Sequence, residues 1–136
     1  MLCTSGNDAH ISGAVELGLG MCAPILLNPA DHNLWTKING DRRYWSLDVV
    51  SRVAIGRDVI RAIHVPSLTE GSVVLHLTGH NSLFTGDALV RDFAGLDSSL
   101  SPELSVDARV HPGHGDSYGL DEVLSSSTIR LVPQNA

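Results

Sequence analysis

The sequence has 136 residues, of which 43% are hydrophobic, and 9 Lys and Arg against 15 Asp and Glu give a net charge of −6. This length fits one compact domain with a sizeable core, and the composition excludes a chain that is disordered throughout. An acidic chain without a basic stripe is not expected to bind nucleic acid. The only local basic cluster, Arg42-Arg43, is interpreted as part of a solvated turn.

No stretch approaches the roughly 20 apolar residues that span a bilayer, and the longest apolar run, Met21 to Leu27, is interrupted by Pro24. The start of the sequence lacks the basic and apolar regions of a secretory signal, so a cytoplasmic protein without a membrane contact is predicted. Cys3 and Cys22 are too few for a disulfide framework and are expected to be reduced and partly buried.

The first third of the chain predicts two short helices around one strand. A helix is expected to begin near His10 and to end at the pair Gly18 and Gly20. The apolar run 23–27 is typical of a buried strand. Asn28 followed by Pro29 predicts the start of a second helix, which runs toward Trp35. Residues between Trp35 and Asp48 show no clear periodicity.

The centre of the chain predicts a β-meander. Residues alternate in character over 59–65 and 72–78, and a third strand is expected at 83–85 after a tight turn at 79–81. A short strand follows at 108–111. The Ser-rich stretch 96–105 is expected to be a loop, and a helix is predicted at 120–126.

Three residues that can bind a metal ion follow or begin predicted elements. His10 opens a helix, Asp87 follows the strand at 83–85, and His114 lies between two glycines after the strand at 108–111. Two imidazoles and one carboxylate can form a facial metal site. Spacing alone does not bring three such distant residues together.

Several motifs resemble those of the metallo-β-lactamase superfamily, and most of all its glyoxalase II-like hydrolases. They are the stretch from Ile63 to Val74, the sequence Leu83-Phe84-Thr85-Gly86-Asp87, and the sequence His111-Pro112-Gly113-His114-Gly115. The resemblance implies an α/β fold, the αββα sandwich of that superfamily. It also implies that residues 1–136 form a single partial domain without the N-terminal strands, because family members have further strands before their His-rich motif.

The resemblance further implies a degenerate metal centre. Asp87 matches a carboxylate that binds metal and orients water, His114 matches a ligand of the second metal, and His10 matches the last histidine of the His-rich motif. The remaining ligand positions of the family carry residues that do not bind zinc, namely Ser5, Asn7, Ala9 and Leu68. At most one ion is therefore expected, held by His10, Asp87 and His114, with zinc favoured over iron.

Residues outside this trio are expected to have structural roles. Asp8 lies one position from the missing aspartate of the family motif, and it is predicted to cap a helix rather than to bind metal. The other histidines are expected on strands, in turns or in a helix, with His64 and His76 half-buried or at the surface of the sheet. These histidines are His32, His64, His76, His80 and His111.

Three functions remain open at this point. The first is a weak metal-dependent hydrolase in which Asp87 orients the water that attacks a small ester, thioester or amide. The second is a metal-free family member without catalytic activity, which acts as a binding or scaffolding module. The third, a lesser alternative, is sulfur oxidation at a single iron. Absent N-terminal strands would leave a sheet edge uncovered, so self-association or a partner chain is also expected.

Overall fold

A computed structural model describes residues 1–48, 52–88 and 107–122 of the chain. The N-terminal part carries three α-helices, one 3-10 helix and a two-stranded parallel sheet. These elements are α1 (Asp8–Ile11), α2 (Ala14–Gly20), β1 (Leu26–Leu27), η1 (Pro29–Asp31), α3 (His32–Asn39) and β2 (Trp45–Ser46).

A six-stranded sheet follows, in which the strands lie side by side in the order of the sequence. All neighbouring strands are antiparallel except β6 and β7, which are parallel. The strands are β3 (Arg52–Ile55), β4 (Asp58–His64), β5 (Val73–Leu77), β6 (Ser82–Gly86), β7 (Arg109–Pro112) and β8 (Tyr118–Gly119), and the 3-10 helix η2 (Thr78–His80) joins β5 to β6.

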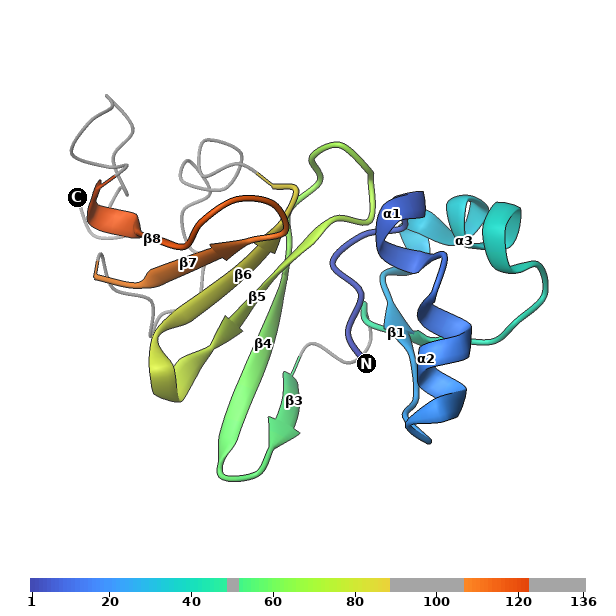
Figure 1. Cartoon of the computed structure of the whole chain (residues 1–136), viewed down its shortest axis with the longest axis horizontal. Helices are drawn as coiled ribbons and strands as arrows, with labels where there is room; N and C mark the ends of the chain where they lie inside the picture. The colour runs from blue at the N-terminus through green and yellow to red at the C-terminus, as the bar shows by residue number, and fades with distance from the viewer. Residues whose placement is uncertain (49–51, 89–106, 123–136) are drawn as a thin grey trace.

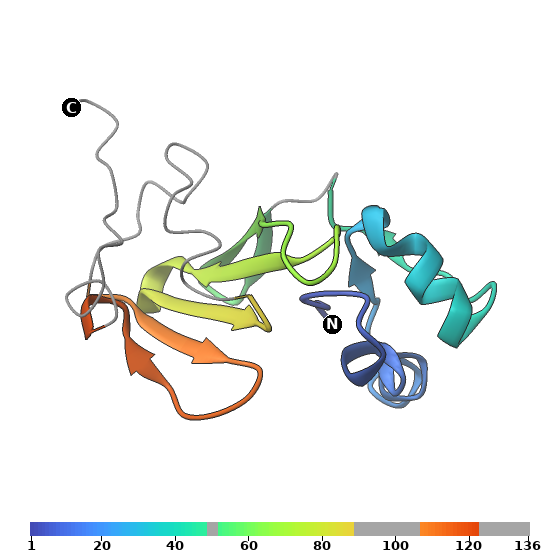
Figure 2. The same ribbon diagram turned by 90° about the horizontal axis from the view of Figure 1, so that it is seen from above.

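The elements form layers, with the helices on the far side of β1 from the six-stranded sheet (Figures 1 and 2). One apolar cluster lies between the helices and β1, and it includes Ile11, Leu27 and the fully buried Trp35. A second cluster joins Leu26 of β1 to Leu75 of β5. Since this second cluster draws on both sheets, burial of apolar surface holds the two sheets together.

The central β-meander is confirmed, because β4, β5 and β6 pair in sequence order and the tight turn at η2 and Asn81 joins β5 to β6. Asn81 takes the left-handed conformation at the end of that turn, with φ of 46°. The predicted strand at 108–111 is also confirmed as β7. β3 and β8, at the two edges of the sheet, were not predicted.

The N-terminal helices differ in detail from the prediction. Two helices replace the single one expected near His10, and the second of them, α2, ends at Gly20, in the glycine pair where the sequence predicts a helix end. The strand expected at 23–27 is limited to Leu26–Leu27. Asn28 caps the next helical segment as predicted, since its side chain accepts a hydrogen bond from the backbone N–H of Ala30. The second helical segment extends beyond Trp35 to Asn39.

Two predicted segments in the later part of the chain are not fully described. The loop predicted at 96–105 lies outside the described residues, and so does the predicted helix at 120–126 apart from its first turn, which begins at Leu120. No helix in the described ranges has the length and apolar character needed to cross a membrane.

The cysteines correct one further expectation. Both are free thiols, and Cys3 is buried as part of the apolar cluster under the helices. Cys22 is exposed, although a partly buried thiol was predicted. It lies in the turn after α2, where its φ of 50° is the left-handed conformation common at helix ends.

The turn between β5 and β6 makes a testable contribution to acid stability. Asp58 accepts hydrogen bonds from the backbone N–H groups of Val59 and Gly79 and from the side chains of His80 and Thr78. These contacts lower the pKa of Asp58 from its ordinary value of 3.8 to about 2, and the hydrogen bonds from the two backbone N–H groups have the largest effect.

A carboxylate with a lowered pKa stabilises the folded state above its unfolded pKa, and this stabilisation is lost as the pH falls toward the folded pKa. We therefore expect urea unfolding midpoints of the unmodified protein to fall more steeply between pH 4 and pH 2 than those of Asp58→Asn. Asp121→Asn, at an exposed carboxylate, is the matched control. Equal slopes for Asp58→Asn and the unmodified protein would contradict this account.

Candidate functional site

Asp87 owes its position to a sharp turn at the end of β6. Gly86 has φ of 56°, a conformation that other residues rarely adopt. A Cβ atom on Gly86 would also lie 2.5 Å from Oγ1 of Thr4. Glycine at this position therefore lets the chain turn against Thr4 and presents the Asp87 carboxylate at the strand end.

His114 arrives at the same place because β7 runs parallel to β6. The carboxyl ends of parallel neighbours meet at one edge of a sheet, where ligands commonly bind. The backbone N–H of Gly113 donates a 2.8 Å hydrogen bond to the carbonyl of Gly86, which fixes the two loops against each other. His114 follows directly, and its Nε2 lies 3.5 Å from Oδ1 of Asp87.

His10 reaches the site from the N-terminal part of the chain. It lies in the short helix α1, and its Nε2 is 2.9 Å from Oδ2 of Asp87. Its other ring nitrogen, Nδ1, lies 3.3 Å from Oγ1 of Thr4. Thr4 therefore orients the imidazole so that Nε2 faces Asp87, as groups behind a metal-binding histidine commonly do.

The three predicted residues thus form one cluster. One ligand atom from each of His10, Asp87 and His114 lies within 4.8 Å of the other two. The side chains of His10 and Asp87 are 15% and 20% exposed, whereas that of His114 is 79% exposed. The cluster therefore has a protected side and a side that is open to solvent.

Ser5 and Asn7, at positions where the resemblance implies metal ligands, bind the local backbone instead. Ser5 is buried, and its Oγ accepts a hydrogen bond from the backbone N–H of Asn7. Asn7 caps α1 by accepting from the N–H of Ala9. The predicted cap, Asp8, is instead the first residue of the helix, because the extended backbone of Asn7 places the Asn7 oxygen over the first turn. Leu68 is 74% exposed.

The remaining histidines lie outside this cluster. His76 was predicted to be half-buried or at the surface, and this prediction is wrong. β5 lies between β4 and β6 inside the sheet and both of its faces are covered, so the His76 ring is fully buried. His64 is exposed and contacts the carbonyl of Glu70. The others make local polar contacts: His32 with Tyr44, His80 with Asp58, and His111 with Ser117.

A buried carboxylate that the sequence did not single out supports the site. Asp31 is 1% exposed and accepts hydrogen bonds from the backbone N–H groups of Gly6 and Gly71, at 2.7 and 2.8 Å, and from Oγ1 of Thr69. Gly6 precedes α1 and His10, and Thr69 follows Leu68. Asp31 therefore connects the loop that leads to His10 with the loop that carries Leu68.

Two cavities flank the cluster of His10, Asp87 and His114. One of about 380 Å³ is lined by Thr4, His10 and His114 together with the first three residues of the chain. The other, of about 400 Å³, is lined by Asp87, His114 and several apolar side chains. His114 borders both, so the cluster is accessible from two directions.

No protein-family model matches the sequence, and no curated protein sequence matches it either. Solved structures do match. TTHA1623 in a di-iron-bound form is 21% identical with a TM-score of 0.70, over 96% of this chain and 76% of that one. The BLEG-1 B3 metallo-β-lactamase is 16% identical with a TM-score of 0.68, over 91% of this chain and 73% of that one. This chain has the metallo-β-lactamase fold.

A third structure, ETHE1 from Myxococcus xanthus, is 22% identical with a TM-score of 0.61, over 89% of this chain and 57% of that one. The predicted α/β sandwich of the metallo-β-lactamase type is therefore confirmed. Identities of this size show the fold alone. The chemistry of a site depends on its own residues rather than on the fold.

The buried side chain of Asp31 makes a testable contribution to the stability of the fold around the site. Asp31→Ala would leave the backbone N–H groups of Gly6 and Gly71 buried without an acceptor. We expect it to lower the free energy of unfolding by about 3 kcal/mol, since each buried unsatisfied donor costs about 1 to 3 kcal/mol. Chemical denaturation of this variant beside Asp41→Ala, at an exposed carboxylate, measures the difference. Equal losses in the two variants would contradict the role of Asp31.

Proposed function

We propose that this chain binds one divalent metal ion at His10, Asp87 and His114 and that it hydrolyses small ester, thioester or amide substrates slowly. The observation that carries the proposal is the convergence of two imidazole nitrogens and one carboxylate oxygen within 4.8 Å of one another. Three protein ligands with an open position are typical of catalytic zinc sites. The same donor set suits ferrous iron, which is the second choice of metal.

The residues present fit such an ion. Thr4 contacts Nδ1 of His10 and leaves Nε2 facing the cluster. Asp87 directs one carboxylate oxygen toward His10 and the other toward His114. A bound ion of this kind acts as a Lewis acid and lowers the pKa of water to about 7.

Within this proposal the chain's own groups position the reactants. The Asp87 carboxylate accepts a hydrogen bond from the attacking water and so orients it toward the substrate carbonyl. The cavity of about 400 Å³ has apolar walls from Leu68, Ala88, Pro112 and Tyr118, which favours a substrate with an apolar acyl or alkyl group. Activity is expected to be weak, because Ser5, Asn7 and Leu68 offer no ligands for a second ion.

One observation favours a second candidate function, a metal-free binding module. His10 and Asp87 already contact each other directly at 2.9 Å, so the cluster is held together by a hydrogen bond without an ion. Ser5 and Asn7 serve the local backbone at positions where the family resemblance implies metal ligands. Metal content separates the two candidates.

The first test is the metal content of protein purified without chelator and then equilibrated with zinc. We expect about one zinc per chain, and we expect Asp87→Ala and His114→Ala to lose it because each removes one of three ligands. His32→Ala, at an exposed histidine of α3, is the matched control and should keep the metal. A screen of aryl esters and thioesters should then show turnover that depends on added zinc.

Absence of bound zinc in the unmodified protein would overturn the hydrolase proposal and favour the metal-free module. Zinc that remains in both Asp87→Ala and His114→Ala would place the ion elsewhere. One zinc per chain without turnover of any ester or thioester would support the metal site and contradict the hydrolytic activity.

We also propose that residues 1–136 form one domain and that two copies of it associate through the strand edge at the start of the chain. Met1 and Cys3 pair with Leu26 of β1 through backbone hydrogen bonds. The backbone N–H and C=O of Leu2, between them, have no backbone partner among the described residues. The carbonyl of Thr4 accepts a hydrogen bond from the backbone N–H of Val73, so the part of this edge that is left for a further strand is the part at Leu2.

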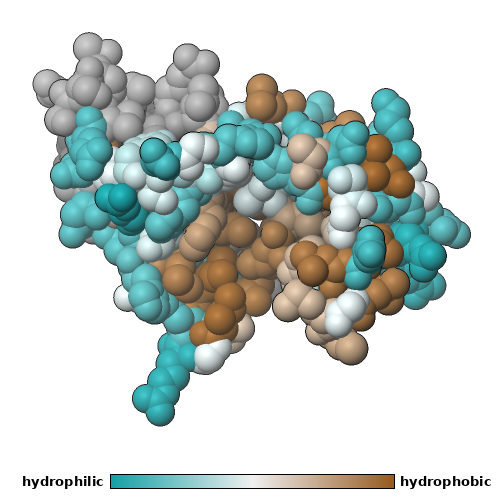
Figure 3. Space-filling view, viewed as in Figure 1, coloured by the Kyte–Doolittle hydropathy of each residue, from teal (hydrophilic) through white to brown (hydrophobic). Residues whose placement is uncertain are grey.

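Apolar surface lies close to this edge. Figure 3 shows apolar side chains gathered over β3 to β5 beside a hollow that faces the N-terminal part of the chain. Leu2, Val53, Ala62 and Leu77 are only partly buried where they pack against the apolar cluster between the two sheets. A second copy that pairs with the Leu2 edge would cover part of this surface.

Sedimentation equilibrium at micromolar concentrations tests the association. We expect a mass near twice the 14.5 kDa of one chain. Leu2→Pro removes the N–H that faces away from β1 and should shift the mass toward the monomer, while circular dichroism shows an unchanged fold. A monomeric mass for the unmodified protein, or a dimer unaffected by Leu2→Pro, would contradict pairing at this edge.

A further inference from the structure

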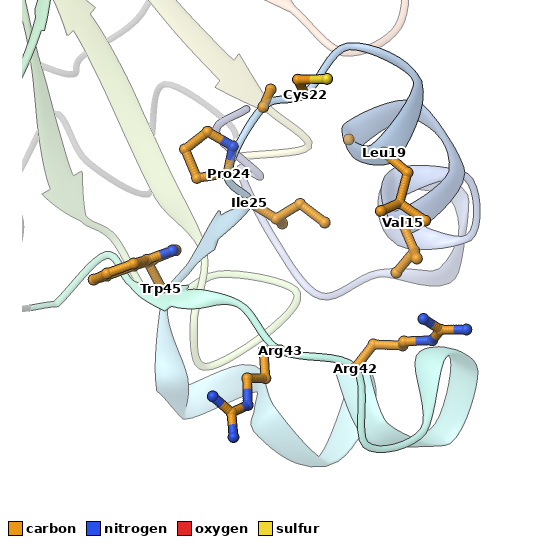
Figure 4. Close-up of a pocket in the computed structure, with 10 residues that line it drawn as sticks. Val15, Leu19, Cys22, Pro24, Ile25, Arg42, Arg43 and Trp45 are labelled. Carbon is orange, nitrogen blue, oxygen red and sulfur yellow. The ribbon is translucent and has the colours of Figure 1, made fainter.

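A groove of about 460 Å³ lies on the helical side of the molecule and shares no lining residue with the two cavities at the metal-binding cluster. It runs between α2 and the segment 42–45, with the turn after α2 at one end (Figure 4). Its volume falls in the range of small-molecule sites.

The floor and one wall of this groove are apolar. Val15 and Leu19 point from α2 toward Ile25, and Pro24 lies beside Ile25 (Figure 4). Leu19 is 69% exposed, and Trp45 at the opposite side is 67% exposed. Large apolar side chains that face water along one groove are typical of binding sites.

The other end of the groove carries positive charge. Arg42 reaches back toward α2 below Val15, whereas Arg43 points away from α2 (Figure 4). Within the described ranges, neither guanidinium forms an ion pair. The whole chain has a net charge of −6. Arg42 nevertheless has no carboxylate partner among the described residues, so its guanidinium beside the apolar groove can bind an anion from solution.

We propose that this groove binds a small amphipathic anion, with its carboxylate on Arg42 and its alkyl or aryl body over Val15, Leu19, Ile25 and Trp45. A guanidinium binds a carboxylate through two parallel hydrogen bonds, which fixes the orientation of the anion. The apolar body covers Leu19 and Trp45 and removes them from water. Neither the metal-binding cluster nor its proposed reaction is needed for this binding.

Tryptophan fluorescence tests the proposal, with decanoate as the probe below the concentration at which it forms micelles. The chain has 2 tryptophans, Trp35 and Trp45. Trp35 is fully buried, so a blue shift on titration reports on Trp45. We expect saturable binding of decanoate and a loss of about tenfold or more in affinity for Arg42→Gln, since a hydrogen bond to a charged group contributes about 1.5 to 3 kcal/mol.

Arg57→Gln, at an exposed arginine in the turn between β3 and β4, is the matched control and should bind decanoate as the unmodified protein does. Decanol, which has the same chain without the charge, should bind Arg42→Gln and the unmodified protein equally and more weakly than decanoate binds the latter. The absence of a saturable blue shift would overturn the proposal. Equal affinity of decanoate for Arg42→Gln and the unmodified protein would overturn it as well.

Discussion

The buried carboxylate of Asp31 is the interaction on which the rest of the site depends. It accepts hydrogen bonds from Gly6, Thr69 and Gly71, which belong to loops far apart in the sequence. A Cβ on Gly71 would lie 2.5 Å from the Asp31 carboxyl carbon, so the approach of that loop requires glycine. A polar group buried in this way is stable only when its oxygens are satisfied, and three donors meet that condition.

Two further features of the fold bring Asp87 and His114 together beside the loop that Asp31 binds. The parallel pairing of β6 and β7 brings Asp87 and His114 to one edge of the sheet, and the left-handed turn at Gly86 presents Asp87 there. His10 comes from the other side of the molecule, through the loop that Asp31 holds. The cluster therefore forms only when the two sheets are packed together, so loss of packing between them should separate its three side chains.

The sequence predicted the parts of this structure that depend on local patterns. Alternating residues gave the meander, Asn28 and Pro29 gave the helix start, and the motifs around Asp87 and His114 gave the cluster through their family resemblance. Asp31 could not be identified in the same way. A carboxylate in the first turn of a helix is ordinary in sequence, and its three donors are distant along the chain.

The errors have comparable physical causes. Asn7 and Asp8 are both good caps, and only the backbone conformation of Asn7 decides between them. The single helix expected to begin near His10 is divided into α1 and α2, because the helical backbone is interrupted between Ile11 and Ala14. The burial of His76 depends on what covers both faces of β5, which alternation along one strand does not specify.

The most direct test of the account is a zinc titration followed by NMR of the histidine side chains, of which the chain has 7. The account predicts that the ring signals of His10 and His114 shift together and saturate at one zinc per chain, with coordination through Nε2 in both. The other five should stay unchanged. Shifts confined to other histidines, or no shift at all, would contradict a metal site at His10, Asp87 and His114.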